Sequence, residues 1–184
     1  QAAATIAEQS HRLSDLISSL RLFADPPRAK RKPTDLPQLI AGVIKQVQQH
    51  YTDARVARPI DLQVNGSPPK LSIDPEQVSQ ALADLLHNAL QSSPRTGVRV
   101  VMRIEEVERL VAIEVTDDGC GMDAHTLEHA FDPFFSAKAA GRRMGMGLPR
   151  ARQLAAAHDG AVELRSAPGR GTTATLLLRL DHAD

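Results

Sequence analysis

The chain has 184 residues, of which 42% are hydrophobic and 24% charged, so we expect one globular domain of medium size with an appendage. Acidic and basic residues balance at 22 each, which gives no charge signal for nucleic acid, and we expect none to bind. The single cysteine excludes an internal disulfide and fits a reducing compartment. No apolar run approaches the ~18 residues of a membrane span, so this fragment is expected to be cytoplasmic without membrane contact, any anchor of a longer protein lying upstream.

The first region, residues 1–25, is predicted to form one long helix. Its apolar residues follow a heptad-like seam: Ile6, Leu13, Leu16, Leu20 and Phe23. Such a helix needs a partner to bury the seam, and Pro26 and Pro27 end it because proline cannot continue the hydrogen-bond ladder. Residues 26–33, which include a short basic run, are predicted to be a solvated linker before a domain over 34–184.

Helices and strands alternate over the rest of the chain. Predicted helices span about 36–47, 75–92, 123–130 and 148–157, and predicted strands span 60–64, 71–73, 98–104, 110–115, 161–166 and 172–180. Asp35 and Asp74 stand at N-cap positions, and Pro75 suits the first turn of a helix. The fold class expected is an α/β (α+β) two-layer sandwich, a mixed, mostly antiparallel sheet covered by helices and preceded by the long N-terminal helix.

The first motif is DLLHN, Asp84 to Asn88, on the predicted helix 75–92. Asp84 and Asn88 are four residues apart and therefore share one helix face, and Gln91 follows about one turn later. The amide oxygen of Asn88 suits Mg²⁺, which takes most of its other ligands from water and phosphates. The alternative is an ordinary polar helix face.

The second motif, DDGCGM, spans Asp117 to Met122 and directly follows an apolar strand. Gly119 and Gly121 permit a tight turn and close approach of a ligand to the backbone. A buried carboxylate at Asp117 could accept a hydrogen bond from the adenine amino group; the alternative is a plain turn, where Asp-Gly is common. The segment lacks the third glycine and the following helix of a dinucleotide fingerprint, and the chain has no P-loop pattern.

The third motif, FDPFF, groups Phe131, Phe134 and Phe135 around Pro133. This cluster predicts an aromatic latch at the edge of a mobile loop, with a local core plug as the alternative. The loop that follows carries Lys138, Arg142 and Arg143, cations that could close over a triphosphate.

The fourth motif is GMGLP, Gly145 to Pro149, immediately before a predicted helix. Backbone amides of a glycine-rich segment at a helix N-terminus form an anion site. The alternative is a simple junction between loop and helix.

Taken together, these motifs resemble the ATP-binding catalytic domain of sensor histidine kinases of two-component systems, in the GHKL ATPase superfamily with DNA gyrase, MutL and the large heat-shock chaperone. DLLHNAL resembles the N box, DDGCGM the G1 box, FDPFF the F box and MGMGL the G2 box, and residues 160–180 resemble the closing hairpin. The resemblance covers about residues 34–181.

The resemblance implies that ATP and Mg²⁺ lie between the N-box helix and a flexible lid, with Asn88 as the metal ligand and Asp117 as the adenine contact. The nucleotide-binding residues that we expect are Asn88, Gln91, Asp117, Gly119, Gly121, Met122, Phe131, Phe134, Arg142, Gly145, Met146, Gly147, Leu148 and Thr172. Asp84, Lys138 and Arg143 are the expected catalytic residues.

Residues 1–25 then resemble the second helix of the dimerisation and phosphoacceptor hairpin. Because no His-acidic-Arg-Pro pattern is present, we expect the fragment to lack its phosphoacceptor histidine. The expected activity is that of a protein histidine kinase, which transfers the ATP γ-phosphate to that histidine for relay to a response regulator receiver domain, in a homodimer formed through the hairpin. The alternatives are an ATPase or serine kinase of the same superfamily, or a nucleotide-binding regulatory module without transfer activity.

Two features depart from the family pattern. Asp84 replaces the usual first asparagine of the N box, and it is one methylene shorter than the glutamate that activates water in the hydrolysing branches. Our hypothesis is that Asp84 positions a water or a second-shell Mg²⁺ contact. Arg143 and Met144 replace a frequent Gly-Thr pair, so the lid hinge is expected to be stiffer or Arg143 to contact phosphate.

Overall fold

The computed structural model describes residues 28–51, 59–66, 70–93, 98–105, 109–136 and 145–180. The predicted long helix over residues 1–25 lies outside them, as do Lys138, Arg142 and Arg143 of the predicted lid. No helix among the described residues is both long and apolar enough to cross a membrane.

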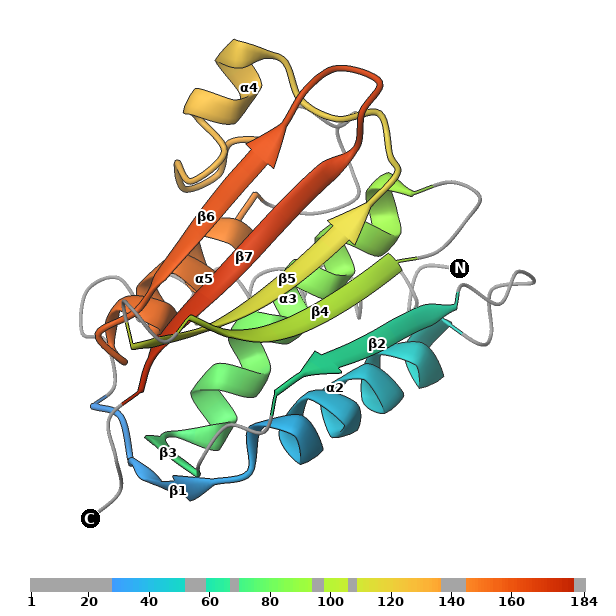
Figure 1. Ribbon diagram of the computed structural model, residues 1–184. Helices are drawn as coiled ribbons and strands as arrows, with labels where there is room; N and C mark the ends of the chain where they lie inside the picture. Colours follow the sequence, from blue (N-terminus) through green and yellow to red (C-terminus); the bar gives the residue numbers. More distant parts are fainter. Residues whose placement is uncertain are drawn as a thin grey trace, which may run out of the picture.

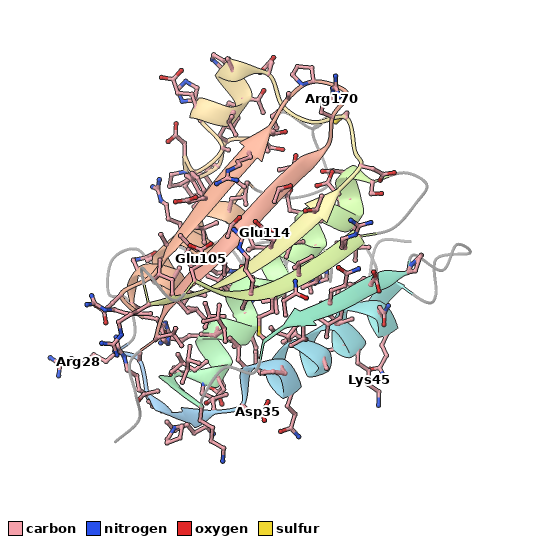
Figure 2. All side chains as sticks on the ribbon, in the orientation of Figure 1. Arg28, Asp35, Lys45, Glu105, Glu114 and Arg170 are labelled. Atoms are coloured by element: carbon pink, nitrogen blue, oxygen red, sulfur yellow. The ribbon has the colours of Figure 1, made fainter. Side chains whose placement is uncertain are left out.

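A five-stranded sheet forms one layer, with strands in the order β2 (Ile60–Asn65), β4 (Val98–Glu105), β5 (Leu110–Asp117), β7 (Thr172–Arg179) and β6 (Ala161–Ser166). β2 runs parallel to β4, and the other neighbours are antiparallel. In β4, buried Val98, Val100 and Met102 alternate with the more exposed Arg99, Val101 and Arg103, which turns one face of the sheet to the core. Glu105 and Glu114 extend from the opposite face (Figure 2).

Three helices form the second layer: α2 (Leu36–Tyr51), α3 (Pro75–Ser92) and α5 (Gly147–Ala156). They lie behind the sheet as drawn in Figure 1, and α3 contacts both α2 and α5. The short α4 (Ala124–Glu128) lies beyond the sheet, near the turn between β6 and β7. The predicted two-layer sandwich with a mixed, mostly antiparallel sheet is confirmed.

The predicted starts of α2 and α3 are confirmed by their caps. Asp35 Oδ1 accepts a hydrogen bond from the N–H of Gln38 at 2.9 Å, and Asp74 Oδ1 accepts from Glu76 and Gln77 at 3.0 and 3.2 Å. Burial raises the pKa of Asp74, but backbone N–H donors, with that of Lys30 foremost, outweigh burial, and the pKa lies below its ordinary value.

The segment expected to be a solvated linker is instead attached to the domain in part. Lys32–Thr34 form strand β1, which pairs antiparallel with β3 (Leu71–Ile73). Arg31 donates to Asp159 Oδ2 at 2.7 Å and to the carbonyl of Ala157 at 3.0 Å, at the end of α5. The partners of this segment lie far along the chain, where no local pattern indicates them.

Candidate functional site

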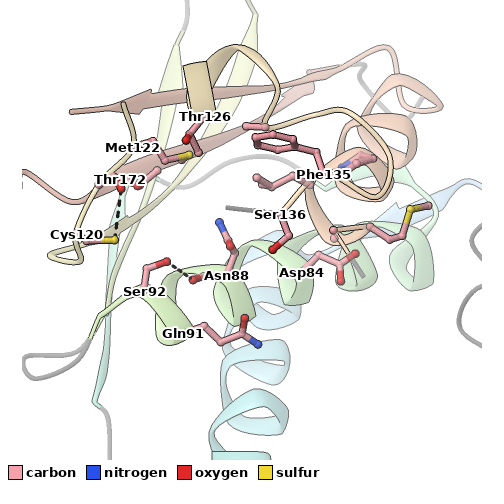
Figure 3. Close-up of a pocket in the computed structure, with 17 residues that line it drawn as sticks. Asp84, Asn88, Gln91, Ser92, Cys120, Met122, Thr126, Phe135, Ser136 and Thr172 are labelled. Atoms are coloured by element: carbon pink, nitrogen blue, oxygen red, sulfur yellow. Dashed lines mark hydrogen bonds between the residues drawn. The ribbon is translucent and has the colours of Figure 1, made fainter. Parts of the chain in front are cut away.

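A cavity of about 200 Å³ opens between α3, the start of α5 and the loop after β5 (Figure 3). Seventeen residues from these elements, from α4 and the segment after it, and from the start of β7 line it: Asp84, Asn88, Gln91, Ser92, Cys120, Gly121, Met122, Thr126, Ala130, Phe135, Ser136, Gly145, Met146, Gly147, Leu148, Pro149 and Thr172. Segments that are far apart in sequence therefore form one site.

The polar face of α3 supplies the floor of the cavity. Asp84, Asn88, Gln91 and Ser92 recur at helical spacing, so they share one face, whereas Leu82, Leu85 and Leu86 are buried in the core. Ser92 Oγ donates to the carbonyl of Asn88 at 3.0 Å. The amphipathic pattern of α3 thus fixes which side chains face a ligand.

Asp84 forms a two-pronged ion pair with Arg150 of α5. Arg150 Nε donates to Asp84 Oδ2 at 2.7 Å, and Arg150 Nη2 donates to Asp84 Oδ1 at 2.6 Å. The Asp84 side chain is only 1% exposed and that of Arg150 is 27% exposed. Arginine suits this contact because its planar fork matches a carboxylate. Both oxygens of Asp84 are thus engaged by α5.

Asp117 lies beside Thr172, which lines the cavity. It ends β5, is 5% exposed, and stands opposite Thr172 in the β5–β7 ladder. Cross-strand partners project from the same face, so Asp117 points to the side of the sheet on which Thr172 lines the cavity. Its Oδ1 accepts a hydrogen bond from the N–H of Gly119 at 2.8 Å. Neither Asp117 nor Gly119 itself lines the cavity.

Two of the motif glycines are required by the backbone. Gly121 has φ +66°, and a Cβ there would come within 1.9 Å of the carbonyl oxygen of Ala167. Gly145 has φ +65°, and its Cβ would come within 2.2 Å of the carbonyl oxygen of Phe135. Residues other than glycine rarely adopt such positive φ values. These glycines fix the path of the loops that surround the cavity.

The three phenylalanines of FDPFF have different environments. Phe135 lines the cavity, and its ring lies 5.5 Å from that of His129. Phe131 is partly buried, with the guanidinium of Arg152 4.8 Å from its ring centre, and Phe134 is 50% exposed. The structure therefore brings Phe135 into the site, not the predicted Phe131 and Phe134.

Most of the predicted nucleotide-binding residues meet at this cavity. Those that line it are Asn88, Gln91, Gly121, Met122, Gly145, Met146, Gly147, Leu148 and Thr172, and Asp84, predicted as a catalytic residue, lines it too. Sequence reasoning missed Ser92, Cys120, Thr126, Ala130, Phe135, Ser136 and Pro149. Helical spacing from Asp84 could have indicated Ser92, and Cys120 lies inside a recognised motif. Thr126 and Ala130 carry no local signal.

The wall formed by α4 is held by a cap. Asp123 Oδ1 accepts a hydrogen bond from the N–H of Thr126 at 2.7 Å, and this bond lowers the pKa of the Asp123 carboxyl. Among the described residues, no group of three or more histidine, cysteine, aspartate or glutamate side chains could hold a metal ion.

Comparison with known proteins agrees with this geometry. Residues 73–182 match the family described as histidine kinase-, DNA gyrase B- and HSP90-like ATPase. The sensor histidine kinase ZraS of Klebsiella oxytoca is 33% identical over 180 residues, which cover 97% of this chain and 38% of ZraS. The signal transduction histidine-protein kinase AtoS of Escherichia coli strain K12 is 31% identical over 169 residues, which cover 92% of this chain and 27% of AtoS. The chain thus spans well under half the length of these relatives.

Two solved structures share the fold. Full-length ShkA in complex with AMPPNP superimposes with a TM-score of 0.84 at 22% identity, covering 99% of this chain and 39% of ShkA. The Acinetobacter baumannii histidine kinase AdeS gives 0.75 at 16% identity, covering 98% of this chain and 82% of AdeS. By the family match over residues 73–182 and the 33% identity to ZraS, the chain belongs to the family of histidine kinase-, DNA gyrase B- and HSP90-like ATPases, and it carries the ATP-binding catalytic domain found in sensor histidine kinases.

Proposed function

We propose that this chain is the catalytic part of a sensor histidine kinase that binds ATP with Mg²⁺ in the cavity described above and transfers the γ-phosphate to a histidine of a phosphoacceptor helix. The observation that carries the proposal is the convergence of Asn88, Thr172 and Gly145–Leu148 on one cavity. These groups suit the metal, base and phosphate portions of one nucleotide.

The adenine would lie at the end of the cavity formed by Met122 and Thr172. Met122 offers apolar contact, and Asp117, next to Thr172 in the sheet, is the candidate acceptor for the adenine amino group. Guanine has a carbonyl oxygen at that position, so a carboxylate there would disfavour it. Either a rotation of the Asp117 side chain or a bridging water molecule would connect its carboxylate to the adenine.

The phosphates would lie toward the start of α5. There the N–H groups of Gly147 and Leu148 have no partner within the first turn of the helix, and the helix dipole favours an anion. Lys138, Arg142 and Arg143 are proposed to add charge from the lid.

Asn88 is the residue proposed to hold Mg²⁺. It lines the cavity between the base and phosphate ends, and its amide oxygen fits an ion that takes its remaining ligands from water and phosphate oxygens (Figure 3). Mg²⁺ would supply charge neutralisation of the triphosphate. The contribution of the protein is then to bind and orient the nucleotide, since phosphoryl transfer depends mainly on positioning and electrostatics.

The wider assignment belongs to the same proposal. Residues 1–25 would be the second helix of a dimerisation hairpin, residues 26–33 its connection to the catalytic domain over 34–184, and a response regulator receiver domain the final acceptor. A cytoplasmic location follows from the use of ATP. Support comes from the names of ZraS and AtoS and from the AMPPNP complex of ShkA.

Two measurements test the proposal on the 184-residue chain. Isothermal titration should detect ATP binding that is tighter with Mg²⁺ than with a chelator. When radiolabelled ATP is added together with a longer chain that carries the whole hairpin, acid-labile label should appear on the hairpin. Absence of ATP binding would refute the proposed site, and hydrolysis without label would favour an ATPase. The surface variant Arg99→Met, on the face of the sheet away from the helices, should behave as wild type.

A further inference from the structure

The charge of the cavity wall is opposite to what a polyphosphate needs. Among the described residues that line the cavity, Asp84 carries the only carboxylate, and no lysine, arginine or histidine lines it. If the proposed function holds, as this inference assumes, ATP must lie beside an acidic side chain. Like charges at close range in a partly buried site repel strongly.

Arg150 neutralises the carboxylate of Asp84 from outside the cavity. Its guanidinium engages both oxygens of Asp84 at 2.6 and 2.7 Å without lining the cavity itself. The carboxylate is therefore paired from outside the space that the nucleotide would occupy. Because Asp84 is almost fully buried, solvent screens this pair less than an exposed pair.

The same contact holds the phosphate end of the cavity together. Arg150 lies one helical turn after Gly147, and a Cβ built on Gly147 would lie 3.9 Å from the Asp84 side chain. The first turn of α5 thus rests against Asp84 of α3, and the forked hydrogen bonds restrain the angle between the helices. A lysine could supply the charge but not this geometry.

We propose that Arg150 is a positioning residue for the nucleotide: it cancels the charge of Asp84 and holds the start of α5 against α3, so that the triphosphate can lie along this wall. Asp84 is then the buried anchor of the ion pair. Its engaged oxygens make it poorly placed to activate water.

The test compares ligands that share the nucleoside but differ in phosphate charge. Dissociation constants for adenosine, ADP and ATP are measured with Mg²⁺ on the 184-residue chain, by calorimetry or by NMR titration for adenosine. In Arg150→Met the dissociation constant for ATP should rise at least about tenfold, and that for ADP should rise less. The dissociation constant for adenosine should stay within about twofold of wild type. The double variant Asp84→Asn with Arg150→Met should bind ATP more tightly than Arg150→Met but less tightly than wild type, because the repulsion is removed while the forked contact between α5 and α3 is still missing. Arg99→Met is the matched arginine control.

Three results would overturn the inference. One is unchanged ATP affinity in Arg150→Met, a second is an equal loss for ATP and adenosine, and the third is no recovery in the double variant. Should Arg150→Met fail to fold by circular dichroism, the near-isosteric Asp84→Asn decides: it should bind ATP at least as tightly as wild type, and a loss beyond about threefold would contradict the proposal. A wild-type chain that binds no ATP would instead refute the proposed function itself.

Discussion

Replacing Gly147 with alanine should separate nucleotide binding from stability. A Cβ at this position would lie 3.9 Å from the Asp84 side chain, an ordinary van der Waals distance, so the fold has room for it. Gly147 begins α5, and alanine is favoured over glycine by up to about 1 kcal/mol in a helix interior. At the first helical position we therefore expect a change of about 0 to +0.5 kcal/mol in the free energy of unfolding.

The same methyl group should impair binding, because Gly147 lines the cavity where its backbone would approach phosphate. Losing one hydrogen bond to a charged phosphate costs about 1.5–3 kcal/mol. That corresponds to roughly a 10- to 100-fold higher dissociation constant for ATP. Adenosine, which has no phosphate, should bind almost as well as to wild type.

The assay pairs urea unfolding with calorimetric titration of ATP and adenosine. Gly145→Ala is the matched control: it has φ +65°, and its Cβ would lie 2.2 Å from the Phe135 carbonyl oxygen, so it should lose at least about 1 kcal/mol of stability. Wild-type ATP affinity in Gly147→Ala would refute phosphate binding at the start of α5. Loss of adenosine binding to the same extent as ATP binding would refute the assignment of Gly147 to the phosphate end.

Three further predictions concern the metal, the base and a helix cap. Asn88→Ala should lower the affinity for ATP about tenfold when Mg²⁺ is present and leave it unchanged when a chelator removes the metal. An equal loss of affinity in both titrations would exclude Asn88 as a metal ligand. Asp117→Asn, which preserves an acceptor for Gly119, should weaken ATP at least about tenfold and reduce the preference for ATP over GTP in competition titrations, and retained preference would contradict the adenine contact. Asp74→Ala should lower the free energy of unfolding by about 1 kcal/mol at pH 7. Because folding lowers the pKa of Asp74 from its ordinary 3.8, this difference is fully present above pH 3.8 and should shrink as the pH falls through the folded value; a difference in urea unfolding that stays constant with pH would argue against it.

The secondary structure could be predicted from the sequence because its causes are local. Asp35 and Asp74 cap the next turn of their own helices, and the first residues of β4 alternate between buried and less buried positions, as the pleat of a strand requires. The floor of the cavity was likewise predictable, since Asp84 and Asn88 share one face of a single helix.

The identity of long-range partners was not predictable in this way. The ring of His158 is buried, accepting a hydrogen bond from the N–H of Asp74 at 3.0 Å and donating to the carbonyl of Leu154 at 2.8 Å. Nothing near His158 in the sequence indicates Asp74. The choice of Phe135 over Phe131 for the cavity depends in the same way on where α5 packs.

By itself, then, the sequence determined the helices, the strands and the class of nucleotide site, because periodicity, caps and glycine motifs act over a few neighbouring residues. Only the tertiary structure decided that β1 joins β3, and that Asp84 is neutralised by Arg150. The sequence does not indicate that Asp84 will pair with Arg150, because the two residues are brought together only by the packing of α3 against α5.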